Sequence, residues 1–157
     1  MAGNLASKEQ AIVTLTTTGA SLTNLSANSA ATTLDCRSAG NAADMLQAQF
    51  QLTCQWATIT GITFGIDVAD LYLVPALDGT NYPDVDTTAG ASHPPTGAFK
   101  ASFIDAKAPT ANTAMTFVTP VVDLFPALYT AYIHNQSGQT MSANWTLKVV
   151  AAQAQYT

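Results

Sequence analysis

Polar and apolar residues alternate most regularly between Leu46 and Trp56. Apolar residues hold every second position there, and glutamines and threonines fill the positions between them. A period of two is typical of a β-strand that turns one face to a core and the other outward. The outward face is predicted to be a row of amides. It is either a solvated surface, the interpretation we favour, or a surface that meets a neighbouring subunit through hydrogen bonds.

Shorter runs of β-branched and aromatic residues predict the other strands, and glycine, proline or asparagine bounds most of them. These runs are Ala11–Thr18, Leu22–Leu25, Thr32–Cys36, Ile59–Ile66, Asp70–Val74, Phe99–Ile104, Ala114–Val118, Tyr129–Asn135 and Asn144–Ala152. No long amphipathic pattern of helical period occurs, and only Asp123–Leu128 predicts a short helical turn.

The run Asp70–Val74 is apolar on both of its faces, so both faces are expected to be covered. Pro75 follows it and has no N–H for a ladder, which places the end of this strand at a sheet edge or a bulge. Asp78–Gly79 then supplies the turn.

About eight strands separated by turn signals, without βαβ spacing, predict an all-β fold: an antiparallel β-sandwich, with a jelly roll of about eight strands as the favoured version. A chain of 157 residues fits one domain, which we place at residues 10–157 after an N-terminal arm at residues 1–9. The expected core comprises Phe50, Trp56, Phe64, Leu71, Leu73, Phe103, Phe117, Tyr132 and Trp145.

The composition limits the possible partners. Only 10% of the residues are charged, against roughly 25% in an average globular protein, which suits a surface covered by neighbours in an assembly better than that of a free monomer. A net charge of −5 and five scattered basic residues argue against nucleic acid. No apolar stretch approaches the roughly 20 residues of a membrane span.

The N-terminus lacks the pattern of a signal peptide, so we expect the mature chain to start near Met1. Synthesis in a reducing cytoplasm would leave Cys36 and Cys54 as free thiols. Cys54 falls on the apolar phase of its strand and is predicted to lie in the core.

No group of residues predicts catalysis. His93 and His134 are the only histidines, and neither has a partner at metal-ligand spacing. There is no nucleophile elbow, and the single glutamate, Glu9, lies in the arm. We therefore expect a protein that is not an enzyme and has no catalytic residue, metal or cofactor. The sharpest chemical alternative is a calcium site of Asp78, Asn81, Asp84 and Asp86, whose spacing does not match an EF-hand loop.

Two segments lie outside the predicted core: the arm and a long loop at residues 79–98. Long loops in compact domains are usually functional or disordered, and the prolines in this one favour an ordered loop that makes contacts. The arm suits strand addition to a neighbour's sheet edge. The predicted interface residues are Asn4, Leu5, Lys8, Asn81, Tyr82, Pro83, Asp84, His93, Pro94 and Pro95.

Three phrases carry a resemblance to a known class: DLYLVPALDGTNYPD at 70–84, HNQSGQT at 134–140 and NWTLK at 144–148. In these the chain resembles capsid decoration or cement proteins of tailed bacteriophages. The resemblance implies a jelly roll that binds the major capsid protein and stabilises the assembled shell, as a homotrimer on the virion surface after synthesis in the host cytoplasm. The alternatives are a jelly-roll carbohydrate-binding module of a head fibre or tail, with Tyr82, Asn81 and Asp84 on the glycan, and a collar or tail accessory protein.

Overall fold

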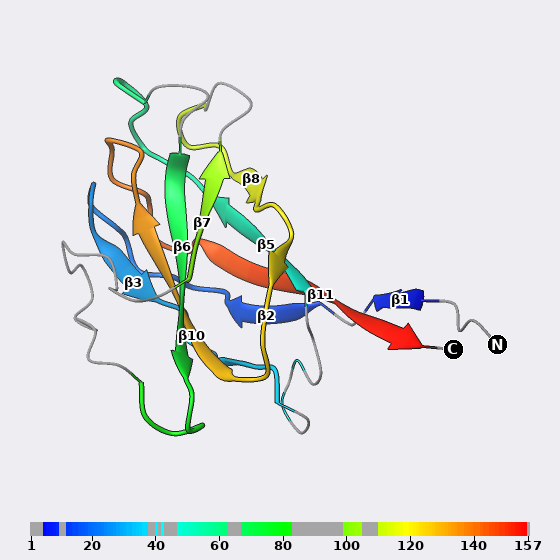
Figure 1. Ribbon diagram of the computed structural model, residues 1–157. Helices are drawn as coiled ribbons and strands as arrows, with labels where there is room; N and C mark the ends of the chain where they lie inside the picture. Colours follow the sequence, from blue (N-terminus) through cyan, green and yellow to red (C-terminus); the bar gives the residue numbers. More distant parts are fainter. Residues whose placement is uncertain are drawn as a thin grey trace.

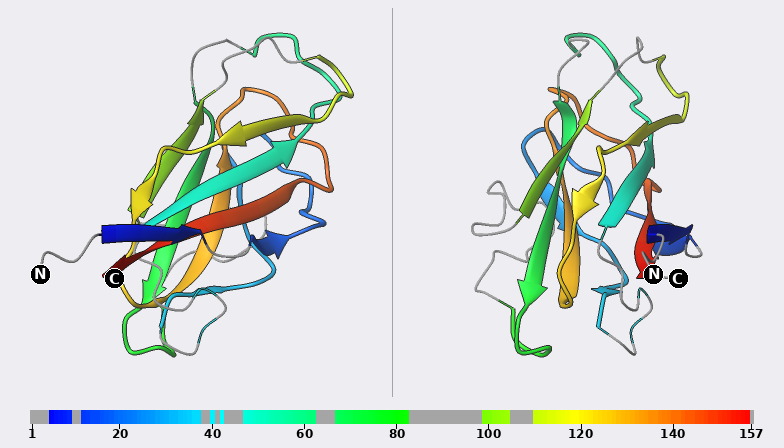
Figure 2. Two further views of the ribbon diagram at one scale, coloured as in Figure 1. Left: turned by 90° about the vertical axis from the view of Figure 1, so that its right-hand side faces the viewer. Right: turned by 45° about the vertical axis from the view of Figure 1, so that its right-hand side comes forward.

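The computed structural model of the protein describes residues 5–9, 12–37, 40, 42, 47–62, 67–82, 99–104 and 110–156. Over these residues the chain is all-β, and its strands form two antiparallel sheets in two layers (Figures 1 and 2). This confirms the predicted antiparallel β-sandwich. The described part of the chain contains no helix long and apolar enough to cross a membrane.

The strands are β1 (Leu5–Glu9), β2 (Val13–Thr16), β3 (Ala27–Ser29), β4 (Leu34–Asp35), β5 (Gln47–Cys54), β6 (Asp67–Ala76), β7 (Phe99–Ile104), β8 (Met115–Val118), β9 (Val122–Asp123), β10 (Leu128–Asn135) and β11 (Thr146–Tyr156).

Sheet I has the order β1-β11-β5-β8, with β2 also paired to β11 and β9 also paired to β5. Sheet II has the order β3-β10-β6-β7, with β4 also paired to β10. The chain therefore fills eight strand positions, because β1 with β2, β3 with β4, and β8 with β9 each share one side of a longer strand. Two four-position sheets with these crossovers have the strand order of a jelly roll.

The core lies between the two sheets and contains most of the side chains that the alternation predicts. Phe50, Trp56, Leu71, Leu73, Phe103, Phe117 and Trp145 are all buried there. Both indoles have partners, since the Trp56 N–H donates to Ser137 Oγ at 2.9 Å and the Trp145 N–H donates to the Ala20 carbonyl at 2.8 Å. Cys36 and Cys54 are buried free thiols, as predicted.

Pro75 lies in β6, opposite Tyr129 of β10. Among the described residues, strand β7 pairs with β6 only as far as Leu73, so Pro75 has a described ladder partner on the β10 side alone. The missing N–H of the proline is tolerated because this end of the strand is a local sheet edge, as the sequence predicts.

Four predictions need correction. The predicted strand Leu22–Leu25 holds a single bridge residue, Leu22, and a turn follows it, in which the Ser26 N–H donates to the Thr23 carbonyl.

The other three concern Tyr132, residues 123–128 and Ile59–Ile66. Tyr132 is buried, but it packs with Tyr72 and Val74 on the outer face of sheet II and not between the sheets, because Ala131 and Ile133 take the inward positions of β10. The chain at 123–128 leaves β9, bends at residues 126–127 and enters β10, and it forms no helical turn.

In that segment the buried Val122 and Leu124 alternate with the exposed Asp123 and Phe125, which is the period of a strand and not of a helix. The predicted strand Ile59–Ile66 is also wrong over its described part, where the Ile62 N–H donates to the Ile59 carbonyl and closes a turn. Thr63–Ile66, with Phe64 of the predicted core, lies outside the described residues.

Candidate interaction surfaces

The predicted interface residues fall into two groups. Leu5 and Lys8 belong to β1 at one edge of sheet I, whereas Asn81 and Tyr82 follow β6 of sheet II. Asn4, Pro83, Asp84, His93, Pro94 and Pro95 lie outside the described residues, as does most of the 79–98 loop.

The start of the long loop is a tight turn built on Asp78. One carboxylate oxygen of Asp78, Oδ1, accepts hydrogen bonds from the backbone N–H groups of Thr80 at 2.9 Å and Asn81 at 2.7 Å. The other, Oδ2, accepts one from Asn81 Nδ2 at 2.7 Å. These bonds to the charged form lower the pKa of Asp78, led by the backbone bond from Asn81. Gly79 has a φ of 77°, a conformation that favours glycine.

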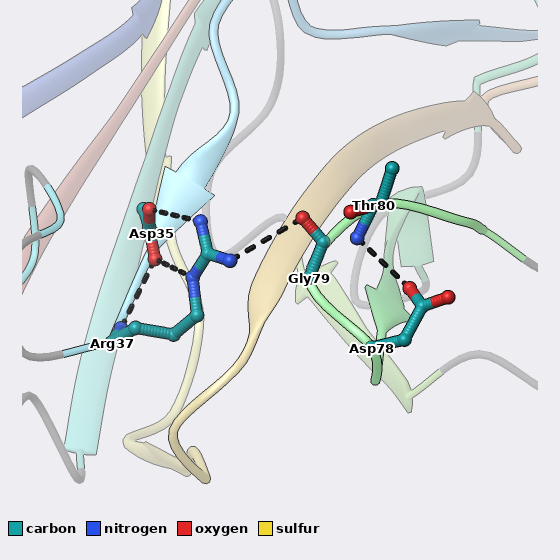
Figure 3. Close-up of polar contacts among 5 residues, drawn as sticks. All are labelled: Asp35, Arg37, Asp78, Gly79 and Thr80. Atoms are coloured by element: carbon teal, nitrogen blue, oxygen red, sulfur yellow. Dashed lines mark hydrogen bonds and ion pairs between the residues drawn. The ribbon is translucent and has the colours of Figure 1, made fainter.

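Arg37 ties this turn to the neighbouring strand β4. Its guanidinium binds the Asp35 carboxylate through two hydrogen bonds, Nε to Oδ1 at 2.8 Å and Nη2 to Oδ2 at 2.7 Å. Its Nη1 donates to the Gly79 carbonyl at 3.3 Å (Figure 3). The hydrogen bonds from Arg37 lower the pKa of Asp35. The exit from β6 therefore has a fixed direction before the long loop begins.

The same turn bears on the calcium hypothesis. Both carboxylate oxygens of Asp78 are engaged in capping the turn, which is an ordinary use of aspartate there. Asp84 and Asp86 lie outside the described residues, and no three acidic, histidine or cysteine side chains of the described part form a metal-binding group.

Tyr82 lies against the outer face of sheet II. Its ring packs against the buried cluster of Tyr72, Val74 and Tyr132. Its hydroxyl is buried and has no hydrogen-bond partner among the described residues. This face points away from the core, yet it is a second, smaller apolar core. The expectation that β6 is covered on both faces is confirmed.

A polar row crosses the same outer face. Ser102 of β7 and His134 of β10 lie directly opposite Asp70 of β6, one on each side. Asp70 is only 1% exposed and accepts hydrogen bonds from Ser102 Oγ at 2.8 Å and from Gln136 Nε2 at 3.2 Å. The Gln136 amide also contacts His134 Nδ1 at 2.7 Å, and His134 Nε2 is buried without a partner.

Sequence reasoning missed this row. Serine, histidine and aspartate are the residue types of a hydrolase triad, but here the carboxylate and not the imidazole accepts the serine hydrogen bond, so the row has no nucleophile-base pair. The local signal for it was Asp70 at the start of an apolar strand. The partners could be found only from the register of three strands.

The outer face of sheet I has the opposite character. Gln47 and Gln49 of β5 are exposed, and their amides reach sideways: Gln47 Nε2 donates to Asp123 Oδ1 and Gln49 Nε2 to the Thr119 carbonyl, both at 3.0 Å. Further along, the hydroxyls of Thr53 and Thr116 lie 2.9 Å apart. The amide row predicted from the alternation is therefore an open and internally hydrogen-bonded face.

An apolar edge borders this face. Val118, Val121 and Phe125 are 55%, 60% and 51% exposed. Phe125 is held firmly, because the Tyr129 hydroxyl accepts from its N–H at 3.2 Å and donates to its carbonyl at 3.0 Å. Exposed aromatic side chains such as Phe125 are enriched in protein interfaces.

The predicted arm is a strand over Leu5–Glu9. It pairs antiparallel with the end of β11, from Leu5 opposite Tyr156 to Glu9 opposite Ala152. Strand β5 pairs with β11 only as far as Ala152, so residues 153–156 pair with β1 alone among the described strands. The result is a two-stranded ribbon that runs beyond the end of β5 (Figure 1).

No protein-family model, no curated protein and no solved structure matches this chain.

Proposed function

We propose that the protein is a non-enzymatic virion structural protein, a decoration subunit that binds the assembled shell of a tailed bacteriophage and stabilises it. The observation that carries the proposal is the ribbon of β1 and the end of β11, which runs beyond the end of β5. A two-stranded ribbon is only marginally stable by itself in water. Among the described residues the outer backbone edges of this ribbon have no strand partner, and such edges are templates for a strand of a neighbouring protein.

The low charge of the chain supports the same proposal. Only 10% of the residues are charged, and the open face of sheet I consists mainly of amides, hydroxyls and aliphatic side chains, with Lys148 and Asp123 as its described charges. Contacts through such a face avoid the cost of burying charges without partners. The major capsid protein is the proposed partner.

Stabilisation would follow from mass action. A subunit that binds only the assembled shell adds its binding free energy to the resistance of that shell against disruption. A symmetric trimer on a local three-fold axis would multiply weak contacts through avidity. We place the protein on the outer surface of the capsid.

The glycan-binding alternative has less support. Binding a sugar ring needs an exposed aromatic face, but Trp56 and Trp145 are both buried with their indole N–H groups bonded inside the protein. Tyr82 packs against the closed outer face of sheet II.

The test is co-sedimentation with expanded phage capsids that lack the protein. We expect saturable pelleting at a fixed ratio to the major capsid protein. Deletion of residues 1–9 should reduce occupancy while the melting temperature shows that the sandwich persists, and Ala31→Asp, an exposed change away from the ribbon, should bind as the unmodified protein does.

A protein that stays in the supernatant with capsids present would overturn the decoration role. Pelleting with isolated collars or tails instead of shells would move it to those structures. Unchanged occupancy after the deletion would remove the ribbon from the contact.

A further inference from the structure

The open face of sheet I carries two charges in a symmetric arrangement. Lys148 and Asp123 are the only charged residues among the described outward side chains of β2, β5, β8, β9 and β11. In register, Lys148 lies beside Gln51 on one side of β5, and Asp123 lies beside Gln47 on the other side. Gln49 is the midpoint between them.

The separation of the two charges excludes a pair within one chain. Each lies two residues along and one strand across from Gln49, which is about 6.6 Å and about 4.8 Å by ordinary sheet spacing. Their Cα atoms are then about 16 Å apart. Because the two opposite charges lie symmetrically about Gln49, each can meet the opposite charge on a second copy of the same face.

We propose that two copies of the chain pack sheet I against sheet I about a two-fold axis that lies in the contact plane and passes through Gln49. An axis perpendicular to the line between the charges brings Lys148 of each copy over Asp123 of the other. The strands of the two copies then cross at roughly 70°, close to the orthogonal class of sheet packing.

The rest of the face fits a copy of itself. Glutamine amides and threonine hydroxyls both donate and accept hydrogen bonds, so a surface made of them can match an identical surface. The two-fold axis crosses β8 close to Val118, which lies opposite Gln51 of β5. The exposed Val118 side chains of the two copies therefore meet and supply an apolar contact.

The size of the face sets the strength of this contact. Four strand positions by the length of Gln47–Thr53 cover about 400 Å² a copy at ordinary sheet spacing. This is below the roughly 800 Å² a partner of a standard stable complex. The dimer should therefore be weak in dilute solution and become populated when copies are concentrated, and it does not depend on the proposed role in a virion.

Sedimentation equilibrium from about 10 μM to about 1 mM of the full chain tests the proposal. Lys148→Asp places two carboxylates opposite two others, and Asp123→Lys places two cations opposite two others. We expect each variant alone to dimerise at least about tenfold more weakly than the unmodified protein. Mixed in equal amounts they should recover the dimer, because every charge then meets its opposite.

The mixture separates this contact from misfolding, since two unfolded variants would not restore each other. Leu77→Asp adds a charge at a 72% exposed position in the turn after β6 of sheet II and should leave the dimer unchanged. A chain that stays monomeric to about 1 mM would overturn the proposal, and so would a mixture no stronger than its components. Capsid binding is measured separately, so the failure of one proposal leaves the other standing.

Discussion

The two outer faces of the sandwich differ, although both belong to four-position antiparallel sheets. On sheet II most outward side chains of β6 and β10 are buried, including Tyr72, Val74 and Tyr132. On sheet I the outward side chains of β5 and β8 include Gln47, Gln49 and Val118, which remain exposed. One face of the molecule therefore contributes to its stability, and the other is available for contacts.

The largest expected difference in the free energy of unfolding comes from truncating one valine to alanine on each face. Val74→Ala removes buried methyl groups from the outer face of sheet II and should lower the free energy of unfolding by about 2 to 3 kcal/mol. Val118→Ala on the exposed face of sheet I should change it by less than about 0.5 kcal/mol. Urea denaturation measures both, and equal losses would contradict the distinction.

The hydroxyl groups give a smaller contrast. Ser102→Ala removes a donor to the buried carboxylate of Asp70 and should cost about 1 to 2 kcal/mol. Thr116→Val removes one of two exposed hydroxyls that bond each other and should cost less than about 0.5 kcal/mol. The comparison would fail if the exposed pair proved the more costly to break.

The Cys36 thiol lies in the core between the two sheets and belongs to neither outer face. Burial raises the pKa of the Cys36 thiol to about 12, from an ordinary value of 9.0. Above pH 9 the unfolded chain loses this proton while the folded chain keeps it. The free energy of unfolding should therefore fall as the pH rises from 9 toward 12.

Urea titrations at pH 7.5, 9 and 10 measure that slope, and Cys36→Ala should flatten it. Burial also raises the pKa of Cys54, so part of the slope should persist in the variant. An unchanged slope in Cys36→Ala would show that the thiol ionises alike in both states.

The orientation of a strand could be predicted from the sequence where its two faces differ in polarity, and not where both faces are buried. The alternation in β5 is visible because one face is apolar and the other polar, and the open amide face was predicted from it. In β10 both faces are buried, so alternation is lost and Tyr132 was assigned to the wrong side. A strand buried on both faces gives no phase from which orientation can be derived.

The features that depend on register could not be predicted. Asp70, Ser102 and His134 are adjacent because three strands align, and nothing near each residue in the chain encodes that alignment. The symmetric placement of Lys148 and Asp123 around Gln49 has the same origin. At the start of the long loop the turn at Asp78–Gly79 was predictable, but its tie to Arg37 joins residues 42 positions apart.

The position of β11 has a consequence for how the chain folds. Strand β11 pairs with β1, β2 and β5, so sheet I is held together by the strand that comes after all the others in the sandwich. Strand β1 cannot form its pairing until β11 is present, because Leu5 lies opposite Tyr156. Such non-local pairing is typical of domains that fold in milliseconds to seconds, and here the sandwich can close only once β11 has been made.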